Sequence, residues 1–209
     1  MGNIFGTYDT QLLYDWTPDL HDFRDDVYKY PKIKISSSEN NSDLRNKFKE
    51  YTGNFGSTTA NCIASVLDAY EINYTYDTTF KETSIRNCIK RFTLNDSKKL
   101  SYRKICNFKN QIFQALNDGY PVLFGFTVYE SFNTNDVKMT GVVPIPKKDE
   151  KILGGICLII VGYINKIDSW IVRHPFGNKY GDHGYLYISA DILTKTNNST
   201  TDFWTLHYD

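Results

Sequence analysis

The side chains best suited to nucleophilic or metal chemistry are four cysteines and four histidines. A cysteine thiolate can attack a carbonyl carbon, and an imidazole can act as its base or bind a metal. No two cysteines have C-x-x-C spacing, and no histidine lies at metal-ligand spacing from them. The spacing therefore predicts no metal site, no cofactor and no disulfide framework, and reduced thiols are typical of an intracellular protein. The cysteines are Cys62, Cys88, Cys106 and Cys157.

The composition is that of a globular protein without a polyanionic partner. Of 209 residues, 41% are hydrophobic and 23% are charged, which is enough for one domain or two tightly packed subdomains. The formal net charge is zero, whereas nucleic-acid binding depends on a basic surface. No apolar run reaches the roughly 18 residues of a membrane span, and residues 1–14 lack the pattern of a secretory signal. We therefore expect a cytoplasmic protein that binds neither nucleic acid nor membrane.

Two helices are predicted from the spacing of apolar residues. They recur at helical intervals from residue 58 to about 70, where Ser57 or Thr58 can cap the first turn. Because even the small residues there are apolar, this helix is predicted to be buried. A second helix is predicted over about 105–118, ending before a Gly-Tyr-Pro turn. Residues 36–42 have loop composition, and residues 71–104 show no clear period.

Strands follow the helices along the chain. A nearly continuous apolar run at residues 153–164 is typical of a buried strand, and shorter strands are predicted on either side of it. The helices come first along the chain and the strands come later, which is the segregated order of an α+β protein. The shorter strands are expected at residues 122–128, 169–173, 185–188 and 203–207.

Several unusual strings follow one another in a fixed order. They are GYPV at 119–122, GFTVYESF at 125–132, GGICL at 154–158, VGY at 161–163, VRHPFG at 172–177 and YGDHGY at 180–185. Their succession resembles the papain-like cysteine peptidase family, whose intracellular, disulfide-free branch typically reads GYPxxFGF, GGHAxxxVGY, RNSWG and WGxxGY. Upstream, GNFGSTTAN at 53–61 is similar to that branch's QGxxGSCTAN segment. The resemblance covers about residues 50–205.

The resemblance implies a papain-like fold with two subdomains. These would be an N-terminal arm and linker at 1–45, a helical subdomain with a central buried helix at 46–118, and a β-rich, barrel-like subdomain at 119–209. In that fold a thiolate lies at the N-terminus of the buried helix, where the helix dipole favours negative charge. A histidine across the cleft is the base, an asparagine orients it, and a glutamine donates to the oxyanion.

All four of these positions are changed in the present chain. The resemblance assigns the nucleophile position to Thr58, the base position to Ile156, the orienting asparagine to His174 and the oxyanion glutamine to Thr52. Loss of a nucleophile or a base costs on the order of 10⁶ in rate. A threonine hydroxyl needs an adjacent base, which Ile156 cannot provide. No catalytic residue is therefore expected, and the chain is interpreted as a pseudoenzyme.

Other residues could replace the missing groups only in less favourable arrangements. Cys62 follows Thr58 by one helical turn and could share its face, but a small buried side chain is the simpler interpretation. Cys157 should point away from the cleft, because side chains alternate along a strand and it follows Ile156. A direct relay from Thr58 to His174 would lack a base between them. The other histidines are His183, expected in a solvent-facing loop, and His21 and His207, which have no partner pattern.

Three functional hypotheses follow. The leading one is an inactive papain-like protein that binds a polypeptide partner in its cleft or has a structural role. The chain is rich in Asn, Lys, Ile and Tyr, as expected from an AT-rich genome, so a viral, virion-associated protein is included in this hypothesis. The alternative is a hydrolase with a relocated nucleophile, Thr58 or Cys62. The third is a structural subunit whose cleft is filled by its own residues 1–45.

Overall fold

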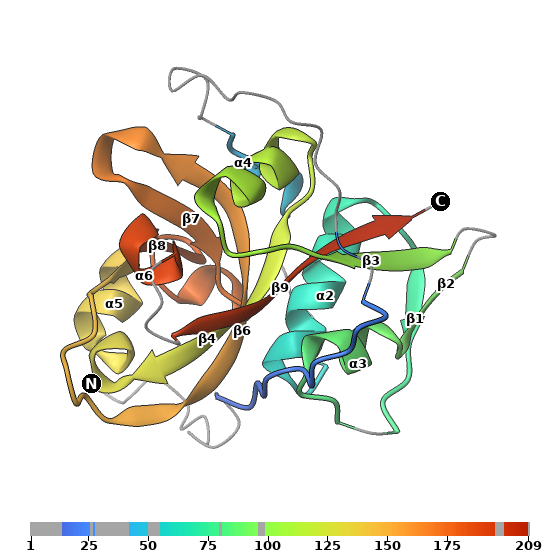
Figure 1. Ribbon diagram of the computed structural model, residues 1–209, viewed down its shortest axis with the longest axis horizontal. Coiled ribbons are helices and arrows are strands. Elements are labelled where there is room, and N and C mark those ends of the chain that lie inside the picture. Colours follow the sequence, from blue (N-terminus) through green and yellow to red (C-terminus); the bar gives the residue numbers. More distant parts are fainter. Residues whose placement is uncertain are drawn as a thin grey trace, which may run out of the picture.

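A computed structural model describes residues 14–25, 27, 42–49, 55–79, 81–95, 99–194 and 199–208. The helices of the first half lie on one side of a long, strongly bent sheet (Figure 1). The α-helices are α2 (Thr58–Ala69), α3 (Ile85–Ile89), α4 (Lys109–Asn117), α5 (Asn135–Thr140) and α6 (Ala190–Thr194). The 3-10 helices are η1 (Arg45–Lys47), η2 (Glu130–Asn133), η3 (Asn165–Ile167) and η4 (Gly177–Lys179).

The main sheet of the described chain has seven strands in the order β3-β9-β4-β6-β7-β8-β5. Neighbouring strands are antiparallel except for the parallel pair β5 and β8. The strands are β3 (Leu100–Lys104), β4 (Val122–Tyr129), β5 (Val142–Val143), β6 (Ile152–Ile164), β7 (Ser169–Arg173), β8 (Tyr185–Ser189) and β9 (Thr200–Tyr208). A separate antiparallel pair, β1 (Tyr74–Tyr76) and β2 (Phe92–Leu94), lies in the helical half.

Helix α2 is buried along most of its length. It begins where the Ser57 hydroxyl accepts a hydrogen bond from the backbone N–H of Ala60 at 3.1 Å, a normal N-cap. Every residue from Thr58 to Leu67 is buried, and none of them is charged. The helix can therefore pack against β6 and α3 without burying an unpaired charge.

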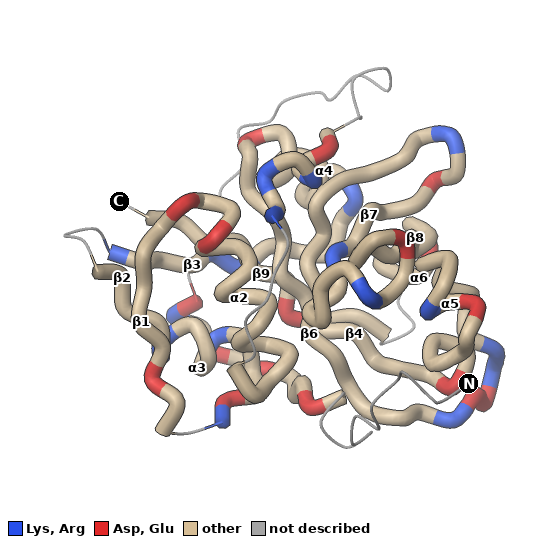
Figure 2. Tube along the Cα trace, turned by 180° about the vertical axis from the view of Figure 1, so that it is seen from behind, with Lys and Arg blue, Asp and Glu red and all other residues tan. Residues whose placement is uncertain are grey.

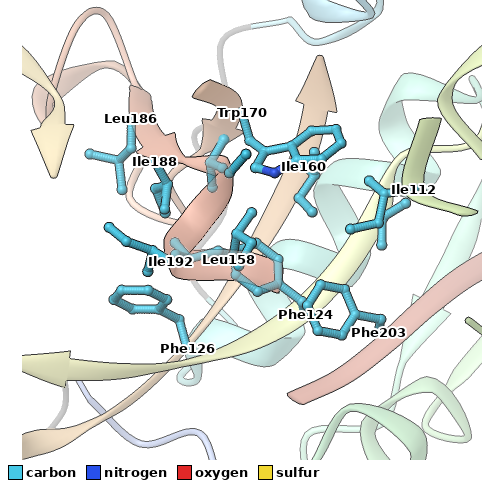
Figure 3. Close-up of a cluster of buried hydrophobic side chains, with 14 of the residues drawn as sticks. Ile112, Phe124, Phe126, Leu158, Ile160, Trp170, Leu186, Ile188, Ile192 and Phe203 are labelled. Atoms are coloured by element: carbon cyan, nitrogen blue, oxygen red, sulfur yellow. The ribbon is translucent and has the colours of Figure 1, made fainter. Parts of the chain in front are cut away.

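Side chains alternate along β6, so consecutive residues pack into two different cores. Leu158 and Ile160 face a core inside the β-rich half, which Figure 3 shows together with Phe124, Trp170 and other large side chains. Cys157 and Ile159 face the other way and pack with α2. Strand β6 is thus buried on both faces, as its nearly continuous apolar sequence predicts.

The α+β class and most of the predicted elements are confirmed. The helix at 58–70 and the strand at 153–164 are found within one residue of their predicted ends. The helix predicted from residue 105 is found but begins only at Lys109, because the N–H of Ile105 still donates to the carbonyl of Phe203 in β9 at 2.9 Å. Residues 71–104 contain β1, α3, β2 and β3, which have three to five residues each and are too short to show a period.

The surface carries charges of both signs. Figure 2 shows acidic and basic residues interspersed over the trace. None of the helices that the structure describes is long and apolar enough to cross a membrane. The loop predicted at 36–42 lies outside the described residues except for its last position, Ser42.

Candidate functional site

The N-terminus of α2 is the centre of the candidate site. Because Ser57 caps the helix, Thr58 is its first residue, and the backbone N–H of Thr58 has no partner within the helix. This N–H and the Thr58 hydroxyl both donate to Oδ1 of Asp15, at 3.2 Å and 2.8 Å. The hydroxyl oxygen also accepts the N–H of Cys157 at 3.4 Å. A carboxylate therefore occupies the helix terminus, where the dipole favours negative charge.

Asp15 belongs to residues 14–25, here called the strap, which run across the molecule and over α3 (Figure 1). We call Asp15 and Trp16 its inner anchor. Asp15 forms a parallel bridge with Gly155 of β6, and the N–H of Trp16 donates to the Gly155 carbonyl at 2.9 Å. The Lys81 ammonium lies 3.1 Å from the second oxygen of Asp15, whose side chain is only 6% exposed. The strap is thus attached at the same place as the candidate nucleophile position.

The indole of Trp16 fills a slot between two glycines. A Cβ added at Gly125 of β4 would lie 1.8 Å from Cζ2 of the ring, and one at Gly155 would lie 2.5 Å from Cε3. Any larger residue at either position would displace the ring. Trp16 is 6% exposed, and among the described residues its indole N–H has no hydrogen-bond partner. The ring is therefore held by shape and apolar contact.

Residues Asp19 to Asp25 form the outer anchor, which is polar. The Asp19 carboxylate accepts the N–H of Arg86, in the first turn of α3, at 3.1 Å and the indole N–H of Trp204 at 2.9 Å. The N–H of Asp19 donates to the Asp202 carboxylate at 2.7 Å. Arg86 pairs with Asp25 at 2.8 Å, with both side chains less than 10% exposed. Burial raises the pKa of Asp202 to about 6, and the nearby Asp19 charge acts in the same direction.

The position that the resemblance assigns to the base, Ile156, is fully buried in the core of the β-rich half. Cys157 lies on the opposite face of β6 from Ile156, but that face packs against α2 and Trp16, so the prediction that Cys157 points away from the cleft is wrong. The Cys157 carbonyl accepts the thiol of Cys62 at 3.1 Å. Burial raises the pKa of the Cys157 thiol well above its usual value. The prediction that both cysteines are core residues is confirmed, because neither is exposed to solvent.

His174 is a buried histidine held by its neighbours. Its ring stacks on Tyr180 at 3.9 Å, and its Nδ1 accepts the N–H of Phe176 at 3.2 Å. Burial lowers its pKa to about 3, so the ring is neutral at physiological pH. Among the described residues, none of its hydrogen bonds includes Thr58. The structure therefore does not bring a Thr58–His174 relay together.

The remaining predicted residues lie away from the α2 terminus. The side chain of His183 is 92% exposed in a loop, as predicted, and His21 is exposed on the strap. His207 is not without partners, contrary to the sequence pattern: its Nε2 lies 2.9 Å from the Thr205 hydroxyl and its ring packs on Tyr120. The first contact lies within β9, whereas the second joins segments that are distant along the chain. Thr52 lies outside the described residues.

The chemistry available at the α2 terminus is limited. The Thr58 hydroxyl has the Asp15 carboxylate as its hydrogen-bond acceptor, and the Ser57 hydroxyl caps the helix. Neither an imidazole nor a thiolate contacts the Thr58 hydroxyl among the described residues. No group of three His, Cys, Asp or Glu side chains in the described chain could hold a metal ion.

Sequence reasoning did not find the strap residues that complete the site, Asp15, Trp16 and Asp19. The sequence assigns their segment only to the N-terminal arm and linker at 1–45, because no clear helical period marks it. The glycines of β4 and β6 could have indicated this contact, because a glycine within a strand often marks the close approach of another group. Gly125 and Gly155 are such positions, and the indole of Trp16 is what approaches them.

Comparison with known proteins gives a consistent family signal. The family model described as "Papain family cysteine protease" matches residues 31–202. A curated relative from Acanthamoeba polyphaga mimivirus, an "uncharacterized peptidase C1-like protein", is 38% identical over 93 residues. That match spans 44% of the present chain and only 30% of the length of the relative.

Solved structures agree in fold. Xylellain, a cysteine protease from Xylella fastidiosa, superposes with a TM-score of 0.74 at 22% identity, over 93% of this chain and 95% of that one. A procathepsin B from Trypanosoma congolense gives a TM-score of 0.67 at 13% identity, over 95% and 86% of the two chains. At these identities the likeness shows the shared α+β fold.

Proposed function

Because the chain belongs to the papain family of cysteine proteases, we propose that it is a non-catalytic member that holds a polypeptide segment in the cleft. One observation carries the proposal: the carboxylate of Asp15, from the chain's own strap, binds the N–H and the hydroxyl of Thr58 at the start of α2. The protein would then bind polypeptide, or act structurally, in place of cleaving it.

The chemistry of the site supports this proposal. A thiol nucleophile needs a base or a positive neighbour to form its thiolate, and residues 58 and 156 are a threonine and an isoleucine. His174, with a pKa near 3, would not supply a proton at neutral pH. The two thiols closest to the α2 terminus, Cys62 and Cys157, are fully buried. A thiol–imidazole pair for proton transfer is therefore not found among the described residues of the site.

The closure of the site also supports it. Thr58 is 1% exposed, because the strap covers it. A substrate carbonyl would have to displace Asp15 and Trp16 before it could reach the hydroxyl. The filled-cleft hypothesis and the polypeptide-binding hypothesis are thus compatible, since the strap is itself a polypeptide segment in the groove.

One observation favours a second candidate, a hydrolase that uses Thr58. The hydroxyl donates to Asp15 at 2.8 Å, which is the contact expected between a nucleophile and its base. Against it, the same carboxylate oxygen also binds the Thr58 N–H that would otherwise stabilise an oxyanion. The Asp15 carboxylate would have to leave the Thr58 N–H before the reaction could begin.

The test is hydrolysis of peptides and proteins over a broad pH range, combined with intact-mass detection of thiol- and hydroxyl-directed electrophiles. Wild type is compared with Thr58→Val, Cys62→Ser and Asp15→Asn. The proposal expects no turnover above background in any of them and no adduct confined to residue 58 or 62. Turnover that Thr58→Val and Asp15→Asn both abolish would establish the hydrolase instead.

Location within the cell is a separate proposal. The cysteine content and the AT-rich composition support an intracellular protein of viral origin, packaged in a virion. The mimivirus relative supports a viral origin but is itself uncharacterized. Quantitative mass spectrometry of purified particles against infected cytoplasm would test packaging, and depletion from the particles would contradict it.

A further inference from the structure

The fit between Trp16 and its slot is good in shape and poor in hydrogen bonding. Gly125 and Gly155 leave room for an aromatic ring, and the ring is almost fully buried. Its N–H, however, has no acceptor in the described part of the chain. A buried donor without a partner costs stability, because it loses its hydrogen bond to water. The strap therefore fills the slot with a side chain that is not the best occupant.

A second copy of the chain would not remove this cost. Every copy carries the same indole at position 16, so a strap supplied by another molecule would bury the same unpaired N–H. A phenyl ring has no donor and would avoid it. This argues for a different polypeptide as the alternative occupant.

The groups around the strap set further requirements for a ligand. The N–H and hydroxyl of Thr58, with the Lys81 ammonium nearby, bind the carboxylate that precedes the ring. Four residues later, the Arg86 N–H and the Trp204 indole N–H bind a second carboxylate. Acidic side chains are thus matched by donors at the first and fifth positions of the segment, and the ring is matched at the second.

We infer that the groove is a receptor for a partner polypeptide carrying the segment Asp-Phe-x-x-Asp, which displaces residues 15–19 of the strap. The inference rests on the proposed function, because it names the ligand of a cleft that binds without cleaving. Displacement is reversible: the strap re-enters when the partner leaves, which protects the slot from water. The strap competes from within the same chain, at an effective concentration of roughly millimolar.

The experiment uses a dye-labelled twelve-residue peptide with the sequence of residues 14–25 and three variants of its ring position: Phe, Ala, and 3-benzothienylalanine, which has the shape of Trp without the N–H. Binding to the full-length chain is measured by fluorescence anisotropy, and strap release by hydrogen exchange of residues 14–20. The benzothienyl peptide should bind about tenfold more tightly than the Trp peptide. The Ala peptide should not bind, and Asn in place of both anchoring Asp residues should weaken binding by at least about tenfold.

A full-length chain whose own strap is held less tightly, here called the loosened receptor, makes the test more sensitive. The full-length Trp16→Ala chain has an emptied slot and should bind the Phe peptide more tightly than wild type does. Asp15→Asn serves the same purpose should Trp16→Ala fail to fold. Gly125→Val, which fills the slot, should abolish binding, and a peptide of reversed sequence is the matched control for charge alone.

Two results would overturn the inference. One is the absence of Phe-peptide binding to a folded, loosened receptor, and the other is a benzothienyl peptide that binds no better than the Trp peptide. Both are independent of catalysis, which is followed on the same samples by mass spectrometry of the peptide. Cleaved peptide would contradict the non-catalytic proposal while leaving the binding result to be judged by itself.

Discussion

The inner and outer anchors of the strap hold the same segment by different means. At the inner anchor, an indole fills a slot that exists because Gly125 and Gly155 lack side chains, and a single carboxylate meets the start of α2. At the outer anchor, the backbone N–H of Arg86 donates to Asp19, and its guanidinium pairs with Asp25. This buried polar network also includes Asp202, which accepts the N–H of Asp19. The first depends on shape, and the second depends on charge.

Because the two anchors differ in chemistry, they should respond to different perturbations. A steric change should act at the inner anchor and be nearly independent of pH. A change in protonation should act at the outer anchor and leave the ring in its slot. The inner anchor contacts β4 and β6 and the outer anchor contacts α3 and β9, so the effects of changes at the two anchors should be approximately additive.

The largest effect is expected from Gly125→Val. The new side chain would occupy the space of the Trp16 ring, since a Cβ alone already lies 1.8 Å from it. Loss of the buried indole should lower the free energy of unfolding by about 4 kcal/mol, as for a buried tryptophan replaced by alanine. Denaturant unfolding measures this, and hydrogen exchange should show residues 14–17 released.

Trp16→Ala is the matched partner of that substitution. The double variant should be little less stable than either single one, because both remove the same contact. Fully additive losses would mean that Gly125→Val disturbs β4 itself and that the slot is not what it fills.

Arg86→Met is expected to have the next largest effect. Among the residues that the structure describes, it leaves the buried Asp25 carboxylate with only the more distant Lys104 ammonium, at 3.8 Å. An uncompensated buried charge should cost about 3 kcal/mol in urea unfolding. Adding Asp25→Leu should recover part of this loss. A double variant less stable than Arg86→Met would contradict the ionic description of the outer anchor.

Asp202→Asn should change how stability depends on pH. The pKa of Asp202 is about 6 in the folded chain, above its ordinary value of 3.8, so folding favours the protonated form. The contribution of Asp202 to stability should therefore be greatest below about pH 4 and fall by on the order of 2 kcal/mol as the pH rises to about 6.

The Asn variant keeps an acceptor for the Asp19 N–H, but its stability should not fall in this way as the pH rises. The difference between the free energies of unfolding of wild type and variant therefore measures the contribution of the Asp202 carboxyl. After correction for the intrinsic pH dependence of exchange, hydrogen exchange of residues 19 and 20 should accelerate between pH 4.5 and 7 in the wild type only. If the free energy of unfolding depends on pH in the same way in wild type and variant, Asp202 does not contribute to the outer anchor.

The smallest effect is expected from Asp15→Asn. The amide can still accept from Thr58, but the charge at the helix terminus is lost, which should cost about 1 kcal/mol in unfolding free energy. The cost should shrink with added salt, as Lys81 is partly exposed. Thr58→Val, which removes the hydroxyl and keeps the N–H, is the control and should be insensitive to salt.

Much of the fold could be predicted from local patterns. The buried helix α2 and strand β6 are long enough for their apolar period to be unambiguous, and the ordered strings around Gly119, Gly155 and Gly162 indicated the family. The short elements between residues 71 and 104 could not be predicted, because a strand of three residues is stabilised by its pairing partner and leaves no period of its own.

The candidate site likewise has one part that could be predicted from the sequence and one part that could not. Sequence alone determined which residue types occupy positions 58, 156 and 174, and from this that a thiol–imidazole pair is not expected there. Only the tertiary structure decided what takes their place: Asp15 is 43 residues from Thr58 along the chain, and its carboxylate lies at the helix terminus. The physical reason is that a contact between distant segments depends on complementary shape and charge across the folded interface, whereas a local pattern records only the face on which each residue is buried.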